Sequence, residues 1–148
     1  MIDQDTIIRN LSLFSSVSAP SGAETEILHL FRTEVSQYVD LVKTDPLGNI
    51  YAYKKGCSNK TIMFVAHCDE IGLMIKYIDD RGYIYASPIG GIDPYVLIGQ
   101  KVKILHKNAP VIGIVGMHPI HIQSAKNETK KEISDLWIDI GAKSKKLF

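Results

Sequence analysis

The feature that most constrains this chain is an uninterrupted apolar run over residues 62–66 that ends at a cluster of polar side chains. A run this short, without polar alternation, predicts a strand buried on both faces, as in a parallel sheet covered by helices. His67 and Asp69 follow it directly. Because ligands bind at the carboxyl ends of strands in open α/β sheets, these two side chains could form part of a metal site. A hydrogen-bonded pair at the end of the strand is the alternative, since a His-x-Asp pair often arises by chance.

Composition narrows the class of protein. The chain has 148 residues, 45% of them hydrophobic and 22% charged, which is typical of a globular protein with one domain or two small ones. The net charge of +1 gives no argument for nucleic acid or a membrane surface as a partner. Cys57 and Cys68 form neither a disulfide framework nor a Cys-x-x-Cys site. No signal-peptide pattern is visible, and no apolar run approaches the ~20 residues of a membrane helix. We therefore expect a cytoplasmic protein.

The first part of the chain combines helical patterns with turn signals. A first helix is expected where apolar residues recur at helical spacing after an acidic start (Ile7, Ile8, Leu11 and Phe14; Asp3 or Asp5). Ser21 followed by Glu24 is a capping-box pattern for a second helix. Residues 39–45 and 50–53 are expected to be extended around an Asp-Pro-Leu-Gly-Asn turn. Residues 1–70 should thus contain two helices, a hairpin and the buried strand.

After Gly72 the helical periodicity disappears, and short strands separated by glycine or proline take over. Several short strands at close spacing predict a small barrel or sandwich. The sequence therefore predicts a boundary near Gly72, with an all-β unit beyond it. The expected strands cover residues 73–77, 83–86, 101–105, 111–115 and 137–140.

Seven blocks spread over nearly the whole chain form an ordered pattern. They are Ala-Pro-Ser-Gly-x-Glu from residue 19, Asp-Pro-Leu-Gly-Asn from 45, Ala-His-Cys-Asp-Glu-Ile-Gly-Leu-Met from 66, Gly-Gly from 90, Gly-Gln-Lys-Val from 99, Gly-x-Val-Gly-x-x-Pro-x-His from 113 and Leu-x-Ile-Asp-Ile-Gly-Ala from 136. In this order they resemble the dinuclear-zinc aminopeptidases, a family that includes glutamyl and deblocking aminopeptidases, large tetrahedral assemblies and members with endoglucanase names. The resemblance implies an α/β fold: residues 1–72 are the N-terminal part of a zinc-peptidase domain, and residues 73–148 are an inserted, small β-barrel-like domain used in assembly.

The resemblance also implies roles for the polar cluster. His67 matches a histidine that binds one of two divalent metal ions, zinc or cobalt. Asp69 matches the aspartate that orients this histidine and is counted among the catalytic residues. The physical chemistry agrees, because a carboxylate on the far ring nitrogen fixes the tautomer of a metal-binding imidazole. Glu70 also matches but is not expected to be a ligand. A peptide substrate and a homo-oligomer are the implied partners.

The chain departs from the family where it ends, at Phe148. The family's bridging aspartate, adjacent glutamate pair, further acidic ligand and final histidine come from later segments. The glutamates of this chain include no adjacent pair that could supply the base (Glu24, Glu26, Glu34, Glu70, Glu128 and Glu132). We therefore expect an N-terminal part that is inactive alone, exposes apolar surface around Phe64 and associates or dissolves poorly. The alternative is a non-catalytic fragment whose β domain serves oligomerisation or binding.

The other candidate residues favour structural roles. Pro119 argues against a helix that presents His118 and His121 together, so a loop or structural role is expected for both. Strand alternation would point Cys68 away from its two neighbours and bury it as a small hydrophobe. No pair of carboxylates is placed for glycoside hydrolysis.

Overall fold

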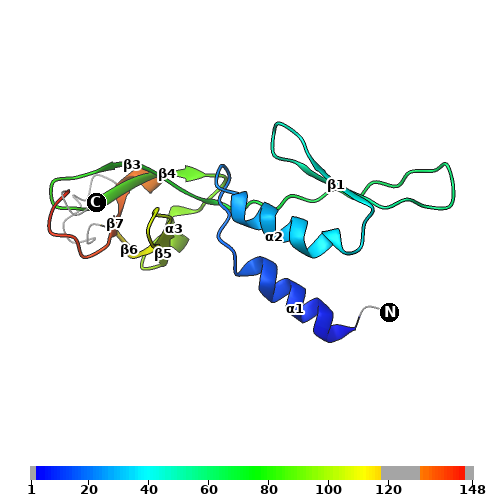
Figure 1. Ribbon diagram of the computed structural model, residues 1–148. Coiled ribbons are helices and arrows are strands. Elements are labelled where there is room, and N and C mark those ends of the chain that lie inside the picture. Colours follow the sequence, from blue (N-terminus) through cyan, green and yellow to red (C-terminus); the bar gives the residue numbers. More distant parts are fainter. Residues whose placement is uncertain (1–2, 118–130, 146–148) are drawn as a thin grey trace. The chain divides into compact units, whose positions relative to one another are not determined.

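The computed structural model describes residues 3–117 and 131–145 and has a mixed α/β fold, which confirms the predicted fold class (Figure 1). The chain divides into two compact units, Met1–Glu70 and Ile71–Phe148. The first unit carries the two long helices and a hairpin, and the second carries a five-stranded sheet.

The first unit begins with the two expected helices, α1 over Gln4–Ser15 and α2 over Thr25–Ser36. Asp3 caps α1, because its side chain accepts a hydrogen bond from the backbone N–H of Thr6 at 2.7 Å. The acidic start predicted for this helix is thus confirmed. An ion pair between Arg9 and Glu34, 3.1 Å long, links α1 to α2.

The capping box predicted for α2 is wrong. The helix starts one residue after Glu24, which is its N-cap and makes no side-chain capping bond. The Glu24 carboxylate instead accepts from the backbone N–H of Gly22 at 2.7 Å. The hydroxyl of Ser21 donates to Asp69, 48 residues further along the chain, so a tertiary partner has replaced the local one.

A two-stranded antiparallel hairpin follows, as predicted, and its strands are β1 (Leu41–Thr44) and β2 (Ile50–Tyr53). Asp45 organises the turn between them. One carboxylate oxygen accepts from the backbone N–H groups of Leu47 and Asn49, both at 2.9 Å. The other accepts from the Asn49 amide at 2.8 Å and the Tyr51 hydroxyl at 3.1 Å. The block of residues 45–49 is therefore a turn closed by one carboxylate.

The buried strand predicted over residues 62–66 is wrong, because these residues form neither helix nor strand and lie exposed. The exposed fractions are 79% for Ile62, 75% for Met63, 92% for Phe64 and 80% for Val65. A strand buried on both faces needs neighbours at both edges and a covering layer. Within residues 3–70 the only sheet is the β1–β2 pair, so nothing covers the run. The exposed apolar surface expected around Phe64 is present.

The second unit holds one five-stranded sheet in the order β3-β4-β7-β6-β5, with every adjacent pair antiparallel. The Asp-Asp-Arg-Gly hairpin predicted between β3 and β4 is confirmed, and Gly82, with φ 93°, donates to the carbonyl of Asp79 at 2.9 Å. The expected strands are present with shifted ends, and a short helix and a 3-10 turn join them. The bounds are β3 Gly72–Ile78, β4 Ile84–Ile89, α3 Pro94–Leu97, β5 Lys101–Ile104, β6 Val111–Met117, η2 Ile133–Asp135 and β7 Leu136–Asp139.

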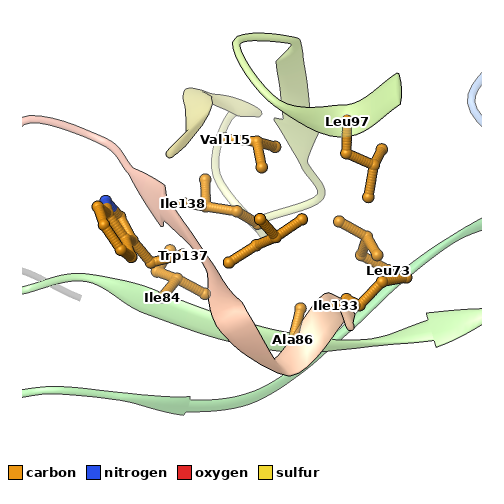
Figure 2. Close-up of a pocket in the computed structure, with 9 residues that line it drawn as sticks. Leu73, Ile84, Ala86, Leu97, Val115, Ile133, Trp137 and Ile138 are labelled. Atoms are coloured by element: carbon orange, nitrogen blue, oxygen red, sulfur yellow. The ribbon is translucent and has the colours of Figure 1, made fainter. Parts of the chain in front are cut away.

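The core of this unit lies on one face of the sheet, where aliphatic side chains from β3, β4, β6, β7 and α3 surround a small pocket (Figure 2). Ile84 belongs to this core and is 0% exposed. The Trp137 ring lies against Gly116, where an added Cβ would come 2.6 Å from its Nε1, so β6 has no room for a side chain there. The glycine at position 116, which belongs to the block that starts at residue 113, thus has a packing reason.

Candidate functional site

The candidate site lies at residues 67–70, directly after the exposed apolar run. His67 Nδ1 is 3.1 Å from the Asp69 carboxylate oxygen Oδ1 and 3.1 Å from the Asp69 backbone carbonyl oxygen. An ionised carboxylate and a carbonyl only accept hydrogen bonds, so Nδ1 is the ring nitrogen that carries the proton. Nε2 then keeps its lone pair, on a side chain that is 86% exposed. In this tautomer Nε2 can bind a metal ion.

The second oxygen of Asp69 has its own partner. The Ser21 hydroxyl donates to Oδ2 at 2.6 Å, a distance typical of a charge-assisted hydrogen bond. The bond from Ser21, and secondly the one with His67, lower the pKa of the Asp69 carboxyl below its ordinary value. Asp69 is therefore an ionised acceptor at neutral pH. Ser21 was missed as a site residue, although the Ala-Pro-Ser-Gly block that contains it was visible in the sequence.

A backbone pairing holds the Ser21 loop against the site. Pro20 and Glu70 form a parallel bridge. The Glu70 N–H donates to the carbonyl of Ala19 at 2.9 Å, and the Ser21 N–H donates to the carbonyl of Glu70 at 3.3 Å. The Glu70 carboxylate accepts from the N–H of the buried Ala19 at 2.8 Å. Hydrogen bonds to Glu70 thus hold the loop before α2 against the segment after residue 66.

Cys68 does not have the place that alternation predicted, because its side chain is exposed and not buried. The predicted strand that would have set this alternation is missing, which explains the error. Partial desolvation, followed by the charges of Asp69 and Glu24, raises the pKa of its thiol. The Cys68 thiol is therefore neutral at neutral pH.

The donor set fits one metal ligand but not a complete centre. Structural and catalytic zinc sites use three or four protein ligands. In the described ranges 3–117 and 131–145, no group of three or more His, Cys, Asp or Glu residues could hold a metal ion. His67 presents an exposed imidazole that is hydrogen-bonded on Nδ1 to a carboxylate. His118 and His121 lie outside the described residues.

No helix in the part of the chain that the structure describes is long and apolar enough to cross a membrane.

Comparisons with known proteins point in one direction. A lysyl aminopeptidase from Pyrococcus furiosus is 41% identical over 72% of this chain and 31% of its own length. The structure of an aminopeptidase from the archaeon Desulfurococcus kamchatkensis matches 95% of this chain and 38% of its own, with a TM-score of 0.86 and 34% identity. The Pyrococcus horikoshii TET1 peptidase, which can assemble into a tetrahedron or a large octahedral shell, matches 94% and 42%, with a TM-score of 0.79 and 34% identity.

The chain thus spans between 31% and 42% of the length of these relatives. The sequence profile of the M42 glutamyl aminopeptidases matches residues 48–147, which is more than half of the chain. The sequence blocks, the α/β fold and these matches agree, and the chain belongs to the M42 glutamyl aminopeptidase family.

Proposed function

We propose that this chain is the N-terminal part of a metal-dependent aminopeptidase, a hydrolase that removes N-terminal residues from peptides. The observation that carries the proposal is the His67–Asp69 pair, in which the carboxylate lies 3.1 Å from Nδ1 and leaves Nε2 open. Membership of the family and the aminopeptidase activity in the names of the relatives support it.

In this proposal His67 is a ligand to one of two divalent ions, zinc or cobalt, and Asp69 is the catalytic-site residue that orients it. Bound metal ions of this kind polarise a carbonyl and lower the pKa of a bound water. The residues of this chain do less: His67 offers one lone pair, and Asp69 holds the proton on the opposite nitrogen. The remaining ligands and the general base lie outside the 148 residues, so the chain alone is inactive.

The second part of the proposal concerns organisation and assembly. Residues 1–72 belong to the peptidase domain, and residues 73–148 form an inserted, barrel-like β domain that serves assembly into a cytoplasmic homo-oligomer. The tetrahedral and octahedral assemblies of the P. horikoshii TET1 peptidase support this part. A non-catalytic chain whose β domain only binds or oligomerises remains the second candidate, because the described residues lack a complete metal site.

The experiment joins this chain to the part of the P. horikoshii TET1 peptidase that it does not match. We expect zinc- or cobalt-dependent hydrolysis of amino-acid p-nitroanilides by the fusion and none by the chain alone. His67→Ala should abolish the activity of the fusion, and Asp69→Asn should lower it about 10- to 100-fold, the usual effect of losing such a partner. His29→Ala removes an exposed helical histidine and is the matched control.

Two results would contradict the proposal. One is a fusion that binds two metal ions per chain and assembles but stays inactive. The other is a His67→Ala fusion as active as the His29→Ala control. Either would favour the non-catalytic candidate.

A further inference from the structure

We propose that Ser21 is a positioning residue for His67: its hydroxyl fixes the Asp69 carboxylate, and through it the tautomer and orientation of the metal-binding imidazole. The inference rests on the proposed function of His67 as a metal ligand. It adds a third member, from a different loop, to the His67–Asp69 pair.

The geometry is a chain of three side chains joined by two hydrogen bonds. Ser21 Oγ lies 2.6 Å from Asp69 Oδ2, and His67 Nδ1 lies 3.1 Å from Asp69 Oδ1 and also 3.1 Å from the Asp69 backbone carbonyl oxygen. The carboxylate accepts on both sides, so both the hydroxyl and the ring nitrogen must donate. The two oxygens of Asp69 thus have different partners: Oδ2 bonds the Ser21 hydroxyl and Oδ1 bonds His67 Nδ1.

The hydroxyl matters because Asp69 has little else to hold it. Its side chain is 38% exposed, and the terminal torsion of an aspartate has broad, weakly preferred wells. Among the described residues, the side chains that hydrogen-bond this carboxylate are those of Ser21 and His67. Without Ser21 the carboxylate is free to rotate and to exchange His67 for water.

The position of Ser21 is itself fixed by the backbone. Its N–H donates to the carbonyl of Glu70, and the flanking bonds between Ala19 and Glu70 set the register of the loop against the site. Gly22 follows with φ 93°, a left-handed backbone conformation that other residues rarely adopt. The loop therefore holds the Ser21 hydroxyl next to the Asp69 carboxylate.

The test is the tautomer of His67 in the 148-residue chain, read from the ¹⁵N NMR signals of its ring nitrogens at a pH where imidazoles are neutral. The wild type should show the proton on Nδ1. Ser21→Ala should move a substantial fraction of it to Nε2, and Ser21→Thr, which keeps the hydroxyl, should restore the wild-type signals. Ser16→Ala removes a hydroxyl that bonds the Leu13 carbonyl and is the matched control. His67→Gln assigns the signals.

An unchanged tautomer in Ser21→Ala would overturn the inference. If the amide signals of Ala19 and Glu70 show that the loop has detached, Ser21→Thr decides: a wild-type tautomer supports the inference, and an altered tautomer in a folded loop overturns it. The proposed function is tested separately by the hydrolytic activity of the fusion, which His67→Ala should abolish whatever tautomer Ser21→Ala shows. In the active fusion, Ser21→Ala should lower zinc affinity about tenfold, the lower end of the range for lost supporting partners.

Discussion

The stability of the second unit should depend steeply on Ile84. This side chain is completely buried, and its neighbours in the core are aliphatic (Ala86, Ile104, Val115, Leu136 and Ile138). Ile84→Ala deletes three carbons at about 0.8 kcal/mol of transfer free energy each, or about 2.4 kcal/mol. The sheet framework cannot collapse fully onto the gap, so the cavity term brings the expected loss to about 3–4 kcal/mol, inside the range of measured Ile→Ala costs.

The assay is urea unfolding followed by tryptophan fluorescence. Trp137 is the only tryptophan of the chain and lies in β7 beside the core, so its signal reports on this unit alone. Ile112→Ala, at a β6 position that is 57% exposed, is the control and should cost less than about 1 kcal/mol. Ile84→Val should cost about 0.5–1.5 kcal/mol and remains measurable if the alanine variant does not fold. A loss for Ile84→Ala no larger than that for the control would refute the packing argument.

Two further predictions concern the first unit. Hydrogen bonds, the largest contribution coming from the Asn49 amide, lower the pKa of Asp45 in the folded protein. A carboxyl with a lowered pKa stabilises the fold above its unfolded pKa of about 3.9. This stability is lost as pH falls through the folded pKa. The protection of the β1 and β2 amides against exchange should therefore fall as pH drops through the folded pKa of Asp45, and an Asp45→Asn variant should show no such acid-dependent step. Phe64→Lys should weaken self-association in sedimentation velocity, because large exposed apolar patches drive association, whereas Leu47→Lys, at an isolated exposed turn position, should change little. A wild-type chain that sediments as a monomer would contradict this second prediction.

Much of the fold was predictable because it depends on neighbours in the sequence. Three features involve residues within a few positions of one another: the Asp3 cap, the Asp45 turn and the β3–β4 turn that contains Gly82. Such local bonds form wherever the residue types and spacing occur, so pattern alone identifies them. The strands of the second unit were also found, with ends shifted by one or a few residues.

The predictions that were wrong concern residues whose conformation or contacts depend on partners far along the chain. Ser21 has the residue type and spacing of a helix cap, yet its hydroxyl bonds Asp69, because the backbone pairing with Glu70 brings a stronger, charged acceptor within reach. The apolar run before His67 has the pattern of a central strand, yet a strand is defined by its hydrogen-bonded neighbours. Those neighbours are missing in residues 3–70.

The sequence by itself determined the family and most of the helices and strands, and it predicted His67 and Asp69 as the site pair. Only the tertiary structure decided which oxygen of Asp69 lies toward His67, which residue holds the other oxygen, and that the apolar run is left uncovered. The physical reason is distance along the chain. Local bonds depend on residue types a few positions apart, whereas the contact between residues 21 and 69 exists only once the loop and the segment after the run have been brought into register.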